Sequence, residues 1–393
     1  MKNINNMHTD FFQNPYPFYD ELRSISPLYR TSLLKYKGVF VTGYEEAVTI
    51  LKDTRFKNRI PLPQSTLKYE SLKDTQNDMF LFKNGADHIK IRMLVNKAFT
   101  PRMIEAYRPY IAETANSLLD EMKPGGTMDI VSDFAFPLAS SVIARILGVP
   151  AEDHQKFREW SIELIQTIDF MRSSKSLKSG NRTIGILINY FKKLIISKEL
   201  YPAEDLISIL IKEEKMTNEE LIATCILLVI AGHETTVNLI SNSLFILLNN
   251  EEQLLELRED LSLMESAVEE CLRYESPTQM IARIAGEDVE INGELIKEGE
   301  HVYIMLGAVN RDPRKFLHAD QFNIRRDPNQ HLAFGAGVHF CLGASLARLE
   351  AQIAISTFLE RIPECTLADS QLKWRRLFSF RSLEEMIIHF HGK

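Results

Sequence analysis

The stretch Phe334-Gly335-Ala336-Gly337-Val338-His339-Phe340-Cys341-Leu342-Gly343 runs directly into the helical segment ASLARLEAQIAISTFLERI (344–362) and decides which fold we expect. Its glycines permit a tight turn against a flat partner. Cys341 then stands just before a helix N-terminus, where the helix dipole and free backbone N–H groups favour a thiolate. A thiolate held in this way can be the axial ligand of haem iron. An isolated cysteine is more often an inert thiol, but this ten-residue pattern favours the ligand.

The composition is that of an ordinary globular protein. The chain has 393 residues, 45% of them apolar and 25% charged, and its 46 basic and 53 acidic side chains give a net charge of −7. This acidic balance argues against nucleic-acid binding. The four cysteines include no CxxC pair and are too few for a disulfide framework, so we expect a reducing, cytoplasmic environment.

No segment is predicted to target or anchor the chain. The N-terminus lacks a basic region followed by an apolar core, so we expect no signal peptide and a mature chain that starts at Met1. The longest apolar run, 221–231, has 11 residues, whereas a membrane-spanning helix needs about 18. We therefore expect a soluble protein with no membrane partner.

Helical periodicity dominates the chain, and strand patterns are few. The helices are expected at 45–53, 107–122, 136–147, 153–168 and 181–199, and the strands at 38–43, 288–296 and 301–306. Asn292-Gly293, inside the second strand segment, is a two-residue hairpin signal. No repeat or Pro- and Gly-rich linker divides the chain. We predict a mainly α protein with small sheets, in a single domain over residues 1–393.

A capping box at Thr217 and Glu220 predicts the start of the longest helix, which extends to about Asn249 and is about 45 Å long. Its apolar sequence is interrupted by Ala231-Gly232-His233-Glu234-Thr235-Thr236. A helical glycine and a buried carboxylate both cost stability, so we expect this segment to have a function. It is not the zinc motif HExxH, because position 237 is Val. The alternative is a purely structural role, in which the segment is a kinked core helix whose hydroxyls donate hydrogen bonds to the preceding turn.

Two further pairs of charged residues have helical spacing. Glu270 and Arg273 share a helix face at i, i+3, and Pro277 ends that helix soon afterwards. His88 and Arg92, at i, i+4, present two cationic donors that could bind carboxylates. Each pair alone would usually be an ordinary solvated surface.

Together these motifs resemble the cytochrome P450 superfamily: Phe334 to Gly343 is similar to its complete haem-binding signature, and the other motifs stand in the family's order. The resemblance implies the mainly α cytochrome P450 fold around a buried haem b, iron protoporphyrin IX. It implies that Cys341 ligates the iron and that Phe334, Gly335, Gly343 and Ala231 also contact the cofactor.

The resemblance also assigns roles to the remaining motifs. His88, Arg92, Arg283 and His339 would hold the haem propionates. Glu234 would belong to the proton-delivery path and Thr235 would hydrogen-bond the bound oxygen. Ala231 and Met280-Ile281 would face the substrate.

The family completes the pair Glu270 and Arg273 with an arginine from the segment before the cysteine. Arg326 matches that position best, but Arg325 stays an alternative. This chain has Ala319 where the family often has Pro and Asn323 where it often has Asp.

Segments outside the haem motifs narrow the resemblance to bacterial members of the family that cleave fatty acyl chains in biotin synthesis. They are 14–23, 41–57, 130–140, 164–170, 224–243, 267–280 and 345–355. The implied reaction is O2- and two-electron-dependent hydroxylation, with possible cleavage, of a fatty acid or of its acyl carrier protein thioester. Electrons would come from NAD(P)H through a ferredoxin or flavodoxin system. The segment 171–216 resembles these members least, which leaves the substrate open.

Three other functions compete with this one. The fold could hydroxylate a terpenoid, steroid or polyketide. It could act as a peroxide-driven peroxygenase, although such members usually lack an acid–alcohol pair such as Glu234 and Thr235. It could also be a haem protein that only binds ligands or transfers electrons. The basic residues Lys90, Lys97, Arg102 and Arg108 either form a docking face for an acidic redox partner or are simply solvated.

Overall fold

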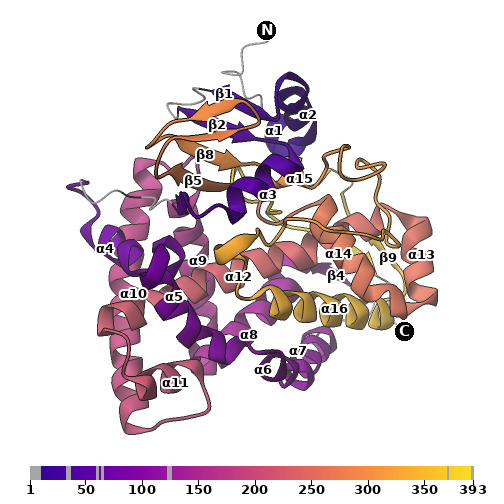
Figure 1. Cartoon of the computed structure of the whole chain (residues 1–393). Coiled ribbons are helices and arrows are strands. Elements are labelled where there is room, and N and C mark those ends of the chain that lie inside the picture. Colours follow the sequence, from indigo (N-terminus) through magenta and orange to yellow (C-terminus); the bar gives the residue numbers. More distant parts are fainter. Residues whose placement is uncertain are drawn as a thin grey trace. The chain divides into compact units, whose positions relative to one another are not determined.

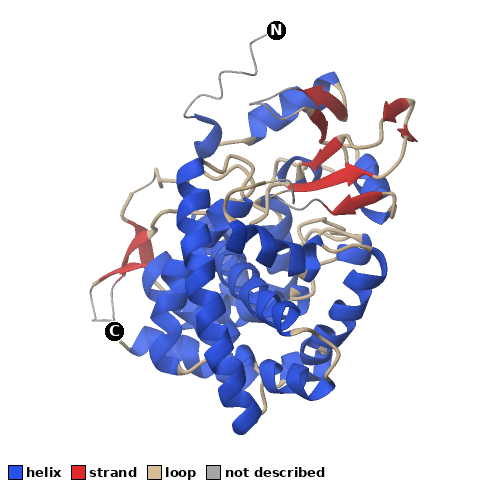
Figure 2. Ribbon diagram, turned by 90° about the vertical axis from the view of Figure 1, so that its left-hand side faces the viewer, coloured by secondary structure: helices blue, strands red, loops and turns tan. Residues whose placement is uncertain are grey.

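A computed structural model describes residues 10–31, 37–58, 62, 66–121, 126–369 and 371–390 of the chain. Its contacts divide the chain into two compact units. Unit 1 comprises Met1–Arg59, Asn242–Cys341 and Ser370–Glu384, and unit 2 comprises Ile60–Ser241, Leu342–Asp369 and Glu385–Lys393. Helices make up most of the structure and strands are few and short, as the sequence predicts (Figures 1 and 2).

Unit 1 is built on a five-stranded sheet with the strand order β1-β2-β8-β5-β3. The strands are β1 (Leu28–Thr31), β2 (Gly38–Val41), β3 (Phe56–Asn58), β5 (Ile281–Ala285) and β8 (His301–Ile304). Only the pair β2 and β8 is parallel. The sheet therefore joins strands from two distant parts of the sequence. Its apolar side chains form one core with those of α3 (Tyr44–Lys52), including Val41, Ile50 and Ile304.

The other elements of unit 1 are mostly short helices. They are α1 (Asp10–Gln13), α2 (Tyr16–Ile25), α13 (Glu251–Glu259), η6 (Leu261–Leu263), α14 (Met264–Tyr274), α15 (Leu306–Val309), η7 (Gly337–His339) and the hairpin of β6 (Val289–Ile291) and β7 (Glu294–Ile296). Asn292 and Gly293 both have positive φ, at 51° and 82°, which confirms the predicted tight hairpin turn.

Unit 2 is largely helical. Its helices are α4 (Glu70–Asp78), η2 (Phe80–Phe82), α5 (Gly85–Val95), η3 (Asn96–Phe99), α6 (Pro101–Glu105), α7 (Arg108–Asp120), η4 (Ile130–Ala135), α8 (Phe136–Leu147), η5 (Ala151–Asp153), α9 (His154–Ile168), α10 (Ser174–Leu200), α11 (Leu206–Glu213) and α16 (Ala344–Arg361). A small antiparallel sheet has the order β4-β10-β9, formed by β4 (Thr127–Asp129), β9 (Cys365–Leu367) and β10 (Ile387–Phe390).

The longest helix, α12, spans Asn218–Leu248, and the part up to Ser241 belongs to unit 2. Its predicted capping box is confirmed: the Glu220 N–H donates to the Thr217 hydroxyl at 3.1 Å, and the Thr217 N–H donates to the Glu220 carboxylate at 3.2 Å. Two stretches, Ile130–Leu147 and α12, are long and apolar enough to cross a bilayer, but 72% and 78% of their most apolar windows are buried inside the protein. That burial is the pattern of a core helix.

The predicted helices agree with α3, α7, α8 and α9 to within two residues at each end. The predicted start of α10, residue 181, is wrong by seven residues. The helix begins at Ser174, because Ser173 and Ser176 form a capping box there. The strands β1, β3 and β5 were not predicted, because each has only three to five residues and depends on a distant partner strand.

Candidate functional site

The loop that precedes Cys341 is held by its own backbone. The Gly335 N–H donates to the Leu332 carbonyl at 2.8 Å, and the Cys341 N–H donates to the Phe334 carbonyl at 3.0 Å. The chain then enters α16, whose N-cap is Gly343. The Cys341 thiol is exposed, three residues before the first residue of that helix. The thiol is therefore accessible and stands shortly before a helix N-terminus, an environment that favours the thiolate form.

Two glycines give this loop its shape. Gly335 and Gly337 have φ values of 69° and 71°, in the left-handed region that residues with a Cβ rarely adopt. A Cβ on Gly337 would lie 2.2 Å from the Leu51 carbonyl oxygen of α3, whereas one on Gly335 or Gly343 would meet no protein atom within 4 Å. Gly337 therefore lets the loop pack on α3, and Gly335 and Gly343 leave room beside the loop.

In unit 1 the structure brings Arg283 and His339 together through Asn58. The strand register places Asn58 of β3 opposite Arg283 of β5, and the Arg283 guanidinium donates to the Asn58 side-chain oxygen. The Asn58 amide nitrogen lies 3.1 Å from Nδ1 of His339. Arg283 is only 6% exposed, and burial lowers its pKa to about 10. Asn58 had no recognisable signal in the sequence, because only strand pairing brings it to this site.

The other two predicted propionate-binding residues, His88 and Arg92, lie on α5 of unit 2. His88 is buried, and its ring stacks on Phe80 with a centroid separation of 6.3 Å. Burial, and secondarily the charge of Arg92, lower the pKa of His88. The four predicted residues are thus divided between the units, with Arg283 and His339 in unit 1 and His88 and Arg92 in unit 2.

The segment from Ala231 to Thr236 lies in the unit 2 part of α12 and has two different sides. Ala231 is exposed and Thr235 is half-buried, whereas His233 and Glu234 are buried. The Thr235 hydroxyl donates to the Ala231 carbonyl at 2.6 Å. No interruption of α12 marks this segment. The hydroxyl bonds back to the preceding turn.

Glu270 and Arg273 of α14 form the centre of a fully buried ion cluster in unit 1. The Arg273 guanidinium donates to both carboxylate oxygens of Glu270, at 2.7 and 2.8 Å. It also donates to the backbone carbonyls of Asn310, Ala319 and Gln321. A pair of charges this deeply buried is tolerated only when its remaining donors and acceptors are satisfied. The irregular segment after Asn310 supplies those partners.

The structure settles which neighbouring arginine completes this cluster. Arg326 donates to Glu270 at 3.0 Å, whereas Arg325 pairs with Glu256. The two departures from the family pattern are explained by the same contacts. Ala319 contributes its backbone carbonyl and Asn323 its backbone N–H, so the cluster does not depend on either side chain.

The remaining sequence predictions concern single residues. Met280 is buried and Ile281 half-buried at the start of β5. Burial raises the pKa of both the Cys225 and Cys271 thiols, in the second case to about 12. These two thiols are therefore protonated at neutral pH, as expected for inert core cysteines.

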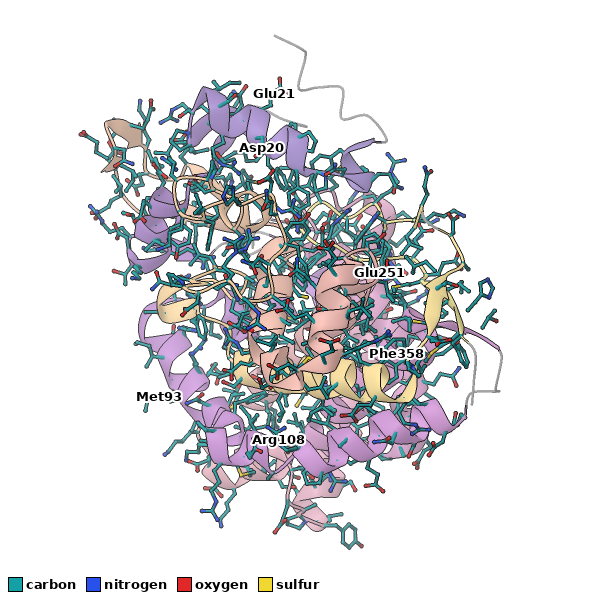
Figure 3. The ribbon with its side chains drawn as sticks, turned by 90° about the vertical axis from the view of Figure 1, so that its right-hand side faces the viewer. Asp20, Glu21, Met93, Arg108, Glu251 and Phe358 are labelled. Atoms are coloured by element: carbon teal, nitrogen blue, oxygen red, sulfur yellow. The ribbon has the colours of Figure 1, made fainter. Side chains whose placement is uncertain are left out.

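The basic residues predicted as a docking face lie on unit 2, where Met93 and Arg108 are exposed at its surface (Figure 3). Arg108 pairs with Glu105 and Lys97 with Glu213, and Lys90 lies 3.8 Å from Glu220. Acidic neighbours thus offset three of the four charges. This finding favours the interpretation as a solvated surface.

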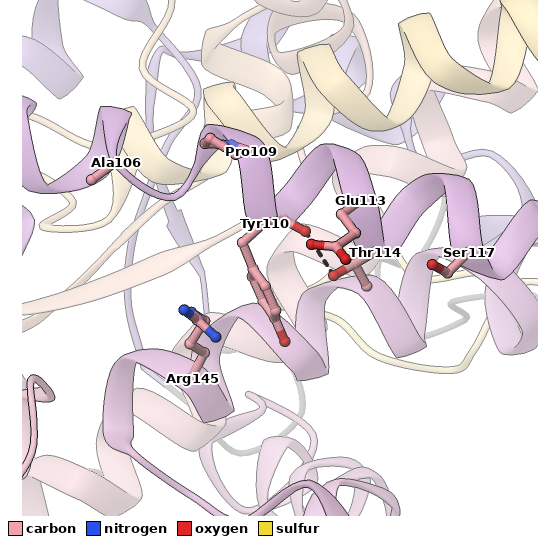
Figure 4. A pocket seen from close by; sticks show the side chains of 7 residues that line it. All are labelled: Ala106, Pro109, Tyr110, Glu113, Thr114, Ser117 and Arg145. Carbon is pink, nitrogen blue, oxygen red and sulfur yellow. Dashed lines mark hydrogen bonds between the residues drawn. The ribbon is translucent and has the colours of Figure 1, made fainter.

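A pocket of about 510 Å³ between α7 and α8 in unit 2 contains none of the predicted site residues (Figure 4). Its lining is Ala106, Pro109, Tyr110, Glu113, Thr114, Ser117 and Arg145. The Arg145 guanidinium lies 4.4 Å above the Tyr110 ring. Its polar groups are the hydroxyls of Tyr110, Thr114 and Ser117 and the charged ends of Glu113 and Arg145, and none of these residues belongs to the predicted motifs.

The chemistry of these donors fits a haem. Within unit 1, the exposed Cys341 thiol could bind iron, and the buried Arg283 guanidinium and the His339 imidazole could bind propionates. Among the described residues no three His, Cys, Asp or Glu side chains gather as a metal site.

Comparison with known proteins agrees with this chemistry. The Cytochrome P450 family model matches residues 3–363. A biotin biosynthesis cytochrome P450 from Bacillus subtilis (strain 168) is 56% identical over 385 residues, which cover 97% of this chain and 98% of that protein.

Solved structures give the same result. The crystal structure of P450BioI in complex with hexadec-9Z-enoic acid ligated acyl carrier protein matches with a TM-score of 0.96 at 56% identity, covering 97% of this chain and 100% of the other. The myxobacterial CYP267B1 in complex with myristic acid matches with a TM-score of 0.90 at 35% identity, covering 98% of both chains.

Proposed function

We propose that this chain, which belongs to the cytochrome P450 family, hydroxylates the chain of a fatty acid carried as a thioester on acyl carrier protein. As a member of the family it has the mainly α cytochrome P450 fold, binds haem b and is a monooxygenase. A haem bound through a thiolate would supply the electron density that favours cleavage of the O–O bond. The reaction takes O2, two electrons from NAD(P)H and protons, inserts one oxygen atom into a C–H bond and releases the other as water.

The similarity to P450BioI carries the choice of substrate, because that relative is seen with an acyl chain on its carrier protein. We propose that two successive hydroxylations on neighbouring carbons give a diol. A third reaction, with another O2, two electrons and two protons, then breaks the C–C bond between the two hydroxyl-bearing carbons, leaving two carbonyl products and two water molecules. The myristic acid complex of CYP267B1 supports a fatty acyl chain more generally.

We propose that Cys341 is the haem ligand and the metal-binding residue. Arg283 and His339 from unit 1, with His88 and Arg92 from unit 2, would bind the propionates, and Asn58 would orient the first pair. Phe334, Gly335, Gly343 and Ala231 would contact the cofactor. The accessible Cys341 thiol and the room beside Gly335 and Gly343 support these roles.

Glu234 and Thr235 are the proposed catalytic residues. The Thr235 hydroxyl donates its proton to the Ala231 carbonyl, so its lone pairs stay available on the more exposed side of α12. It can there accept a hydrogen bond from a water molecule or from a protonated oxygen. Glu234, a buried carboxyl one residue earlier, can bind and release a proton beside it.

We propose that the two units form one domain over residues 1–393. The chain changes unit five times, so neither unit is a continuous segment. We also propose a cytoplasmic location, because four cysteines without a CxxC pair are too few for a disulfide framework in a chain of this length. A separate ferredoxin or flavodoxin, reduced by an NAD(P)H reductase, would deliver the electrons.

An optical titration of the ferric holoenzyme tests the substrate. Hexadec-9Z-enoic acid is added free in one series and as its acyl carrier protein thioester in another, and the shift from low to high spin is measured. We expect tighter binding of the thioester, because docking of the carrier protein adds contact area. The carrier protein without an acyl chain serves as the control and should cause no shift.

Other outcomes would identify the competing functions. Equal or tighter binding of the free acid would indicate a general fatty-acid hydroxylase. No shift with either form would favour a terpenoid, steroid or polyketide substrate. Turnover with peroxide alone, at the rate seen with electrons and O2, would indicate a peroxygenase.

The variant Thr235→Ala tests the catalytic pair. We expect NAD(P)H consumption to continue while the yield of product per NAD(P)H falls about tenfold, because proton delivery is no longer controlled. Thr236→Ser, which changes the neighbouring hydroxyl residue conservatively, is the matched control. An unchanged yield in Thr235→Ala would remove Thr235 from the mechanism.

A further inference from the structure

His233 lies in the middle of the segment that carries Ala231, Glu234 and Thr235, yet the proposed function gives it no task. Its side chain is completely buried, and both ring nitrogens have partners. Nδ1 lies 2.7 Å from the Val229 carbonyl oxygen, and Nε2 lies 3.2 Å from the Ser140 hydroxyl. A carbonyl can only accept, so Nδ1 of the neutral ring carries the proton, and Nε2 faces the Ser140 hydroxyl, which also lies 3.3 Å from the His154 carbonyl oxygen.

Two aromatic rings pack on the same imidazole. Phe136 of α8 stacks on it with a centroid separation of 5.8 Å and an interplanar angle of 16°, and Phe157 of α9 does so at 6.3 Å and 26°. The hydrogen bonds therefore fix the orientation of the His233 ring, and the stacked rings fix its position in the core. All of these partners belong to unit 2.

These contacts hold α12 from the side opposite its exposed face. At about 100° per residue, His233 points about 180° away from the mean direction of Ala231 and Thr235. Beside it, a Cβ on Gly232 would lie 2.9 Å from the side chain of Ile143. Phe136, Ser140 and Ile143 recur at helical spacing on one face of α8. This face of α8 therefore packs directly against the back of α12.

We propose that His233 is a positioning residue for the oxygen chemistry: by holding the back of α12 against α8 and α9, it sets the rotation at which Glu234 and Thr235 are presented. The inference rests on the proposed function of that pair. A small rotation of the helix would move both groups away from the reacting oxygen. The two electrons would then reduce O2 to H2O2 with two protons, and no oxygen would enter the substrate.

The test compares the holoenzyme with two variants, supplied with hexadec-9Z-enoyl acyl carrier protein, a ferredoxin and its NADPH reductase. His233→Phe keeps an aromatic ring but loses both hydrogen bonds of the imidazole. Ser140→Ala keeps the bond at Nδ1 and loses the one at Nε2, together with the hydrogen bond from Ser140 to the His154 carbonyl. We expect the product formed per NADPH to fall about fivefold in His233→Phe and about twofold in Ser140→Ala, with a matching rise in H2O2. The substrate-induced spin shift should keep its midpoint, because His233 and Ser140 are buried on the side of α12 opposite Ala231 and Thr235.

Ile111→Val is the control for a general loss of stability. Ile111 is fully buried on α7, and losing one methyl group there should lower the melting temperature without changing the product yield. If His233→Phe gives the wild-type product yield, His233 is only a core residue. If His233→Phe does not fold, a wild-type yield in Ser140→Ala leads to the same conclusion. A wild-type enzyme that consumes NADPH without hydroxylating the acyl chain would instead overturn the proposed function on which the inference rests.

Discussion

The loop from Phe334 to Cys341 and the segment from Ala231 to Thr236 carry the two halves of the proposed chemistry, and they are held by different means. The loop is shaped by its own backbone, through hydrogen bonds between residues seven or fewer apart and two glycines with positive φ. The α12 segment is an uninterrupted helix whose placement depends on side chains from α8 and α9. Local sequence therefore specifies the shape of the loop, whereas tertiary packing specifies the position of the α12 segment.

This difference predicts which changes each region tolerates. A loop whose shape depends on its backbone should keep that shape when a side chain is replaced. It should lose the shape when one of its glycines is replaced. A helix held by side chains should keep its secondary structure but shift when a partner is lost. The following predictions test these expectations from the largest effect to the smallest.

Replacing Cys341, the proposed iron ligand, should abolish the activity and leave the backbone of the loop unchanged. In Cys341→Ser we expect a loss of activity of at least about 100-fold and of the thiolate-type spectrum of the reduced CO complex, because no thiolate is left to bind iron. Circular dichroism should show an unchanged helix content. Cys365→Ser, outside the site, is the control. A retained thiolate spectrum in Cys341→Ser would disprove the ligand assignment.

Changing a glycine should break the loop itself. Gly337→Ala should lower the free energy of unfolding by about 3 to 4 kcal/mol, because it combines a positive φ with a collision at the Leu51 carbonyl. Gly335→Ala has the same φ strain without the collision and should cost about 1 kcal/mol. Denaturant titrations of both variants give the comparison. Equal losses would show that a Cβ on Gly335 also meets an obstacle, as the proposed haem contact requires.

The segment around Arg326 combines irregular backbone with side-chain anchors. Arg326→Gln should lose about 3 kcal/mol of stability, because Arg326 binds the buried Glu270 and the carbonyls of Leu317, His318 and Gln321. Its neighbour Arg325 makes an exposed pair with Glu256, so Arg325→Gln should lose less than about 1 kcal/mol. The two variants are compared by denaturant titration. A reversed order would contradict the assignment of Arg326 to the cluster.

The α12 anchor should be sensitive to acid. Burial lowers the pKa of His233 from 6.5 to about 4, so between these values the unfolded chain binds a proton that the folded protein does not. Stability from this group is therefore present above pH 6.5 and lost as the pH falls, by about 2 kcal/mol between pH 7 and pH 5.

His233→Phe should remove this part of the pH dependence. The groups that face the ring from α9 and remain in the variant are His154, whose pKa burial also lowers, and Arg158, which lies 5.0 Å over the Phe136 ring. Denaturant titrations of both proteins from pH 7 to pH 5 give the difference. Parallel curves would show that His233 does not titrate as a neutral, buried group.

The sequence predicted the local features of this protein because their causes are local. Helical periodicity located α3, α7, α8 and α9, the reciprocal bonds of Thr217 and Glu220 located the start of α12, and Asn292-Gly293 located the hairpin. The Cys341 pattern likewise identified the family. Each depends on residues a few positions apart, so their physical reasons can be read from the chain itself.

The tertiary structure decided what depends on residues far apart in the sequence. The five-stranded sheet joins strands around residue 40 to strands around residue 300, and its register alone brings Asn58 to Arg283 and His339. Packing chose Arg326 over Arg325, since only one of the two reaches Glu270. It also placed Ser140, Phe136 and Phe157 around His233. No local pattern encodes these contacts, because each exists only once distant elements have packed together.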